Sequence, residues 1–125
     1  MTVFVTQEVM MRNHQSGELE RKFDLTKAEI FGDLDILLLP GQDLISSVPV
    51  VRQLREKLRN FNDDDYLLLL GDPALMAAVA AIAATRNEGR FKLLKYDRGW
   101  DPIKGRDPKK GGYIPVQVDI SGKEL

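Results

Sequence analysis

The stretch YLLLLGDP, residues 66–73, decides the expected fold. Its apolar run is typical of a strand that is buried on both faces, as in the middle of a parallel sheet. Glycine then permits a sharp turn, Asp72 can cap a helix, and Pro73 suits the first helical position. We therefore predict a central strand, fully buried at Leu69 and Leu70, that leads directly into a helix.

The flanking sequence repeats this alternation of strand and helix. The run 34–39 is apolar on both faces and predicts another interior parallel strand, which Pro40 and Gly41 end. From Ser47 to Phe61, apolar residues recur at helical spacing. The predicted central elements are a strand over 34–39, a helix from Ser47, a strand over 66–70, a helix over 73–86 and a strand over 90–96. Two consecutive crossover connections of this kind make the centre of the sheet parallel.

The N-terminal third predicts one strand and one short helix. Residues 2–9 alternate as a strand does, although its place in the sheet stays open. Residues 11–22 show no convincing period and are expected to form an irregular excursion. A capping-box spacing over 26–29 predicts a helix over 27–31, which a left-handed Gly32 would end.

The C-terminal strand completes the expected fold. Residues 113–120 alternate in polarity and should run antiparallel to the preceding strand across a long loop. Pro115 cannot donate to a ladder, which places this strand at an edge or a bulge. We predict an α/β fold, a small three-layer or two-layer Rossmann-like domain, with a mostly parallel sheet of about five strands and an antiparallel edge strand. Residues 1–125 are expected to form this single domain, with a mobile basic loop at 97–112.

The composition excludes several classes of protein. Apolar residues make up 43% of the 125 and charged residues 30%, an ordinary globular balance. The net charge of −1 argues against a chain that binds nucleic acid non-specifically over its whole surface. The absence of cysteine excludes disulfides and thiolate zinc sites and fits a reducing cytoplasm. We expect no signal peptide, and no membrane span, because the longest uncharged apolar run has about thirteen residues where a span needs about twenty.

A ligand site is expected at the carboxyl edge of the parallel strands, where loops and helix N-termini converge. The candidate ligand-binding residues there are Gly41, Gly71, Asp72, Asp97 and Arg98. No glycine belongs to a dinucleotide or phosphate-loop motif. We therefore assign no catalytic residue, no metal ligand and no cofactor.

Three aspartates follow the parallel strands, at positions 43, 72 and 97. Converging carboxylates could hold Mg²⁺ for phosphoryl transfer, although helix capping and loop chemistry explain these positions more simply. His14, the only histidine, has no nucleophile or acid around it in the sequence and is expected to be a solvent-exposed loop residue.

The loop from 97 to 112 combines positive charge, glycine and one aromatic residue. Its candidate ligand-binding residues are Arg98, Trp100, Lys104, Arg106, Lys109 and Lys110. Such a loop could close over a nucleotide or contact nucleic acid by charge and stacking, or it could be a flexible hairpin without a ligand.

The helix over 73–86 has no polar face from Ala74 to Ala84. A helix that is apolar all round must be covered all round, and one sheet covers one side only. Either the N-terminal half or a second subunit covers the rest, so we expect a homodimer or larger homo-oligomer.

Four segments resemble small uncharacterised proteins of tailed bacteriophages, including phages of cyanobacteria. They are residues 23–32, 65–73, 93–98 and 113–115, within a likeness that covers most of residues 23–120. The resemblance implies a phage origin and activity in the host cytoplasm, and it supplies no catalytic residue. The basic insertion before Tyr113 is longer than in these relatives.

Three functions follow from these observations, in order of preference. The first is a non-enzymatic phage accessory protein that binds a host or phage macromolecule, most simply a protein. The second is a nucleotide or nucleic-acid binding protein that uses the carboxyl edge and the basic loop. The third is a Mg²⁺-dependent phosphoryl-transfer enzyme.

Overall fold

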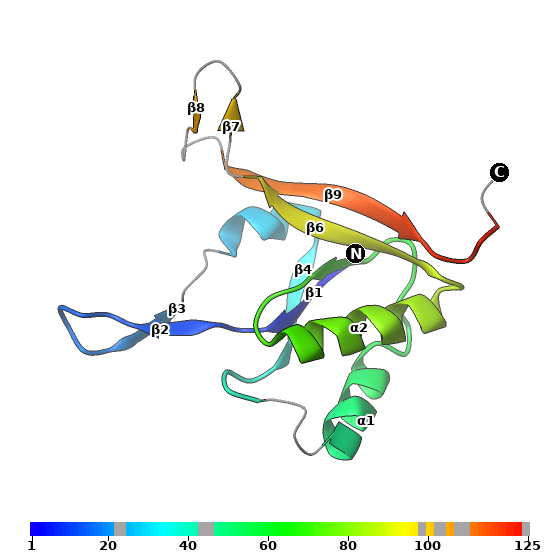
Figure 1. Ribbon diagram of the computed structural model, residues 1–125, viewed down its shortest axis with the longest axis horizontal. Coiled ribbons are helices and arrows are strands. Elements are labelled where there is room, and N and C mark those ends of the chain that lie inside the picture. The colour runs from blue at the N-terminus through cyan, green and yellow to red at the C-terminus, as the bar shows by residue number, and fades with distance from the viewer. Residues whose placement is uncertain (22–24, 43–46, 98–99, 102–104, 107–110, 124–125) are drawn as a thin grey trace.

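A five-stranded sheet forms the centre of the protein (Figure 1). The computed structural model describes residues 1–21, 25–42, 47–97, 100–101, 105–106 and 111–123. The strand order is β4-β1-β5-β6-β9. These strands are β1 (Thr2–Gln7), β4 (Asp33–Leu38), β5 (Tyr66–Leu68), β6 (Arg90–Asp97) and β9 (Gly112–Asp119). The first four are parallel to one another and β9 is antiparallel to β6, which confirms an α/β fold with an antiparallel edge strand.

β1 lies between β4 and β5, which answers the question that its sequence left open. The predicted interior position of β4 is therefore wrong, because β4 is an edge strand. Asp33 and Asp35 on it are exposed, and only Leu37 and Leu38 are buried. These two leucines share an apolar cluster with Leu54 of α1 (Ser47–Lys57). Packing of this helix therefore explains why both side chains at the end of an edge strand are buried.

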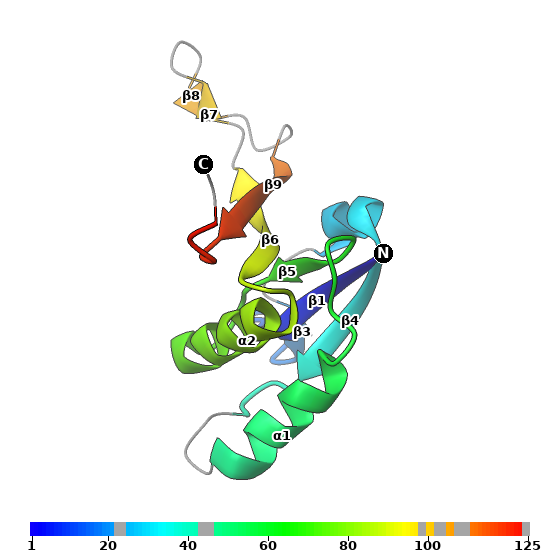
Figure 2. The ribbon, with the colours of Figure 1, turned by 90° about the vertical axis from the view of Figure 1, so that its right-hand side faces the viewer.

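The helices divide between the two faces of the sheet (Figure 2). α1 and α2 (Pro73–Arg86) cover one face, where Leu54, Leu75 and Val79 join Leu67 of β5 in one cluster. The 3₁₀-helix η1 (Thr26–Phe31) covers the other face with Ala28 in a second cluster. Right-handed connections produce this arrangement, since the chain moves one way across the sheet from β1 to β4 and the other way from β4 to β6.

α2 has the bounds that its local signals predict. Asp72 Oδ1 accepts a hydrogen bond of 2.8 Å from the backbone N–H of Ala74, and Pro73 occupies the first turn. At the other end, the N–H of Gly89 donates to the carbonyl of Ala84 over 2.7 Å, with Gly89 at φ 88°. A proline in the first turn and a left-handed glycine stop are both local effects, which is why the sequence predicts them well.

The expected helix over 27–31 is instead a 3₁₀-helix over Thr26–Phe31 without the predicted capping box. Its N-cap is Leu25, which has no side chain that can accept a hydrogen bond. Gly32 ends the element at φ 151° and ψ −179°, which is not the left-handed helical conformation. A Cβ there would lie 2.6 Å from the carbonyl oxygen of Met1, so close approach to the N-terminus explains this glycine.

The excursion over 11–22 is partly regular, because β2 (Met10–Arg12) pairs antiparallel with β3 (Leu19–Arg21). Asn13 Oδ1 orders the turn by accepting the backbone N–H of Gln15 over 2.8 Å. His14 lies exposed in this turn, as expected. β1 accordingly ends at Gln7, two residues earlier than predicted.

The prediction that Leu69 and Leu70 are fully buried is wrong. β5 ends at Leu68, and both later leucines are half-buried where the chain turns toward α2. Full burial falls on Leu67 and Leu68, in the third strand of five.

Candidate functional site

The side chain of Gln7 joins the carboxyl ends of three parallel strands. Its Nε2 donates to the carbonyl of Leu39 over 3.0 Å and to that of Gln42 over 2.7 Å, both after β4. Its Oε1 accepts the backbone N–H of Asp72, after β5, over 3.2 Å. Gln7 itself ends β1 and is buried. The point at which the chain reverses its direction across the sheet is thus occupied by the protein's own amide group.

Gly71 packs directly against this amide. It adopts φ 92°, and a Cβ built there would lie 2.9 Å from Cβ of Gln7 and closer still to Oε1. The glycine is therefore required by the close approach of Gln7 and by its backbone conformation. Gly41 also has a positive φ, 82°, but it is exposed in the turn after β4 with no atom within 4 Å of a Cβ.

The predicted carboxyl-edge residues divide between two places. Gly71 packs against Gln7, and the backbone N–H of Asp72 donates to it. Asp97 instead ends β6 and is the register partner of Gly112 in β9. β6 has one register partner in β5, Leu93 opposite Leu67, and then continues with β9 alone. A hydrogen bond joins the β6–β9 pair to η1, because Nζ of Lys27 donates to the carbonyl of Gly111 over 2.5 Å.

Part of the predicted basic loop lies outside the described residues, namely Arg98, Lys104, Lys109 and Lys110. Trp100 and Arg106 are register partners in a two-stranded ladder, β7 (Trp100–Asp101) with β8 (Gly105–Arg106). Figure 1 shows this ladder beyond the end of β6 and the start of β9. Within the described part of the chain, no three His, Asp or Glu residues are grouped as metal ligands, and Asp43 falls outside that part.

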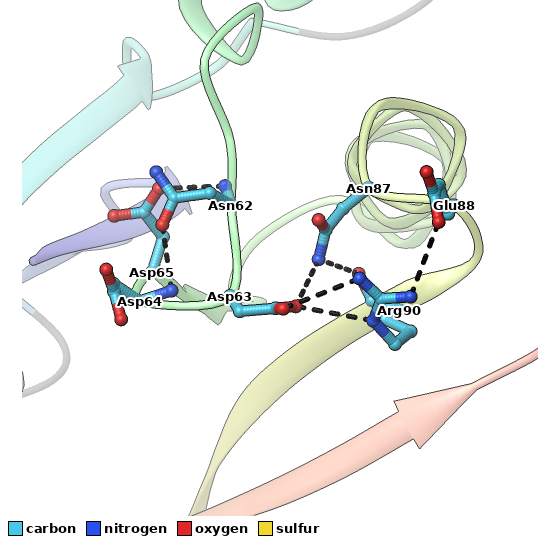
Figure 3. A network of polar contacts seen from close by, with 7 residues as sticks. All are labelled: Asn62, Asp63, Asp64, Asp65, Asn87, Glu88 and Arg90. Carbon is cyan, nitrogen blue, oxygen red and sulfur yellow. Dashed lines mark hydrogen bonds and ion pairs between the residues drawn. The ribbon is translucent and has the colours of Figure 1, made fainter.

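Asp65 holds the amino end of β1, opposite to Gln7. Its Oδ1 accepts the N–H of Thr2 over 3.0 Å. Its Oδ2 accepts the N–H of Asn62 over 3.1 Å (Figure 3). Sequence analysis missed both Gln7 and Asp65. The partners of Gln7 and the Thr2 partner of Asp65 are distant in the chain, and a polar residue beside an apolar run gives no sign of them.

A second polar network joins the loop before β5 to the start of β6. Asp63 Oδ1 accepts Asn87 Nδ2 over 2.7 Å, and Arg90 Nη2 lies 3.4 Å from Asp63 Oδ2 (Figure 3). The hydrogen bond from Asn87, followed by that from Arg90, lowers the pKa of Asp63 below its ordinary 3.8. This network fastens the C-terminal end of α2 to the sheet.

The lowered pKa of Asp63 predicts how its contribution depends on pH. A carboxyl whose pKa is lower in the folded state stabilises the fold above the pKa of the unfolded chain and loses that effect as the pH falls through the folded value. The stability advantage of the native chain over Asp63→Asn should therefore be present at about pH 6 and shrink below pH 3.8. Urea unfolding of both proteins across this range measures it, and an advantage that grows on acidification would contradict the assignment.

One face of β9 is apolar and uncovered. Ile114, Val116 and Val118 are the register partners of Lys95, Leu93 and Phe91, so these six share one face of the ribbon. Leu93 and Phe91 pack against the cluster that contains α1 and α2 residues, so these six side chains point to the side of the sheet on which α1 and α2 lie. No described helix crosses β9 in either view (Figures 1 and 2). Ile114 is 45% exposed and Val116 37%.

We call this surface the open sheet face, defined by Ile114, Val116, Val118, Leu93 and Phe91. The outer edge of β9 is poorly suited to pairing with a further strand. The N–H of Ile120 donates to the carbonyl of Gly89 over 2.8 Å and so points inward, toward β6. Backbone N–H groups alternate in direction along a strand, so the nitrogen of Pro115 points to the outer edge. A sixth strand would need a donor at that position, and proline has none. The prediction that Pro115 marks an edge strand is confirmed.

Comparison with known families identifies where the chain belongs. The family described as Phage Pam3 gp32-like protein matches residues 1–120, which include every strand of the sheet. The chain belongs to this family. No curated protein matches it, and neither does any solved structure. The resemblance to phage proteins is thereby confirmed.

This Phage Pam3 gp32-like family member also has a hollow between its two main helices. A groove of about 430 Å³ is lined by Arg55 of α1 and by Ala81, Ile82, Thr85 and Arg86 of α2. Ala74 and Ala77, on earlier turns of α2, are also exposed. Among the described residues, no helix is long and apolar enough to cross a membrane.

Proposed function

We propose that this member of the Phage Pam3 gp32-like family is a non-enzymatic accessory protein that binds a host or phage protein through the open sheet face. The observation that carries the proposal is the exposure of Ile114 and Val116 on a face of β9 that neither α1 nor α2 covers. Apolar side chains that gather on one uncovered face are stabilised when a partner removes them from water.

The geometry favours a partner that supplies a helix. α1 and α2 form a layer over one side of the sheet, and this layer stops before β9. An amphipathic helix from another protein would extend the layer beside α2 and bury the open sheet face. A partner strand is less suitable, because Pro115 removes a donor from the outer edge of β9.

We further propose that the fold is Rossmann-like and that the protein acts in the host cytoplasm. The strand order supports the first point, since β1 lies between β4 and β5 as the first strand does in doubly wound sheets. Such sheets bind ligands at the point of reversal, where Gln7 lies in this chain. The absence of cysteine supports the second point.

Binding of a nucleotide or nucleic acid stays the second candidate function, and Mg²⁺-dependent phosphoryl transfer the third. Both would place the ligand near Gly71 and the loop over 97–112. The amide of Gln7 fills the space against Gly71, so a ligand there would have to displace three hydrogen bonds of one side chain.

The proposal is tested by affinity purification of the tagged chain from phage-infected host cells. We expect Ile114→Asp with Val116→Asp to abolish recovery of a partner, because a charge on the open sheet face would be buried without a counter-ion. Gln117→Asp is the matched control, since Gln117 is exposed on the opposite face of the same strand.

Equal recovery of the same partner by all three proteins would contradict the proposal. Because Ile114 and Val116 are exposed, the double variant is expected to unfold at nearly the urea midpoint of the native chain. That measurement separates a loss of binding from a loss of folding.

A further inference from the structure

The outer edge of β4 is open to a further strand. β4 pairs with β1 and with no other strand that the structure describes (Figure 2). The N–H of Asp33 donates to the carbonyl of Met1, just before β1, over 3.3 Å and so points inward. Backbone groups alternate in direction along a strand, so the N–H and C=O groups of Leu34 and Ile36 point outward. Each of these two residues offers one donor and one acceptor to a neighbouring strand.

This edge lacks the protection that proline gives to β9. Asp33–Leu38 contains no proline, so every residue of β4 keeps its backbone donor. Side chains of α1 cover the end of the strand, where Gln53 Nε2 and Lys57 Nζ donate to the carbonyl of Leu37 over 3.1 Å and 3.0 Å. The stretch 33–36 lies before this cover and keeps its outer backbone groups available.

The two faces of this open stretch differ in charge. Asp33 and Asp35 are exposed on one face, and neither carboxylate has a hydrogen-bond or ion-pair partner among the described residues. Leu34 and Ile36 lie on the other face, half-buried against the cluster that contains η1. In an antiparallel pair at the outer edge, Asp33 and Asp35 occupy the positions without hydrogen bonds, where facing side chains lie closest. A strand in which cations alternate with apolar residues therefore matches both faces.

We infer that β4 binds an extended segment of another protein, with alternating basic and apolar residues, as an additional strand of the sheet. Main-chain hydrogen bonds supply the affinity, and the two aspartates select the charge of the partner. A second copy of this chain fits less well, because antiparallel pairing of two β4 strands centred on Asp35 sets like charges directly opposite each other. This interface lies beyond the proposed function, since it takes a strand at β4 and the open sheet face lies at the opposite edge, on β9.

Titration of the native chain with two short synthetic peptides, followed by amide NMR, tests the inference. In one peptide lysine alternates with valine, and in the other glutamate alternates with valine. The lysine peptide is expected to shift the amide signals of Leu34 and Ile36 most and to slow their exchange with solvent, because these N–H groups become hydrogen-bonded. The glutamate peptide is expected to leave both signals unchanged, and added salt should weaken binding of the lysine peptide.

Charge reversal on β4 makes the result specific. Asp33→Lys with Asp35→Lys is expected to weaken binding of the lysine peptide at least about tenfold and to create binding of the glutamate peptide. The matched control is Glu18→Lys with Glu20→Lys, which makes the same change of net charge at two exposed residues of another segment. This control should bind the lysine peptide nearly as the native chain does.

Unchanged amide signals of Leu34 and Ile36 at millimolar lysine peptide would overturn the inference, and so would equal binding of both peptides. Slow exchange of these amides that depends on the concentration of the free chain would identify a second copy as the occupant and would also overturn it. Ile114→Asp with Val116→Asp should bind the lysine peptide as the native chain does, so a failure of this inference and a failure of the proposed function can be told apart.

Discussion

Leu67→Ala is expected to lower the free energy of unfolding by about 2–5 kcal/mol, and Leu69→Ala by clearly less. Leu67 is fully buried in the third strand of the sheet and packs against α1 and α2, so truncation leaves a cavity. Leu69 lies beyond the end of β5 and is half-buried, so water can take up part of the lost volume. Urea unfolding of the two variants beside the native chain measures both values.

The comparison between the two leucines decides where the core ends. A loss below about 1 kcal/mol for Leu67→Ala would remove β5 from the core. An equal or greater loss for Leu69→Ala would mean that the buried strand extends to the turn at Gly71. Both variants keep an apolar residue, so the comparison measures volume at matched chemistry.

Gly71→Ala and Gln7→Ala are expected to destabilise the protein through the same contact. Gly71→Ala costs about 1–3 kcal/mol for its backbone conformation and more for the overlap with Gln7. Gln7→Ala leaves partly buried backbone groups of Asp72 and Gln42 without partners, at up to about 1–3 kcal/mol each. The double variant should cost less than the sum, because alanine at position 7 removes the overlap with Oε1 and Cδ, although the contact with Cβ stays.

Gly41→Ala is the matched control for this cycle. Gly41 has a similar positive φ, but nothing lies within 4 Å of its Cβ position. It should therefore lose only the backbone contribution and show no coupling to Gln7→Ala. Strict additivity between Gln7→Ala and Gly71→Ala would contradict the contact on which the description of the carboxyl edge depends.

The fold features that could be predicted from sequence are those set by neighbours in the chain. The bounds of α2 follow from Asp72, Pro73 and the turn ended by Gly89, and the antiparallel pairing of β9 follows from an alternating strand with Pro115. The position of β1 could not be predicted in this way. Its apolar pattern suits an interior place, and so does that of β4, so pairing alone decides which of them lies at the edge.

The candidate site was predictable only in part, for the same reason. Gly71 and Asp72 were recognised by local turn chemistry, yet the residue that fills the space beside them is Gln7, more than sixty positions away in the chain. The open sheet face was missed because alternation in β9 is visible in the sequence, while the missing helix above it is a property of the whole layer.

Methyl NMR of the chain during titration with the partner recovered from infected cells tests the central proposal most directly. Binding through the open sheet face predicts that the largest shifts fall on Ile114, Val116 and Val118 of β9. The methyl groups of Leu39 and Leu70, which follow β4 and β5 at the carboxyl edge, should change little. Shifts confined to Leu39 and Leu70, with Ile114 and Val116 unchanged, would contradict the account and place the binding site at the ends of the parallel strands.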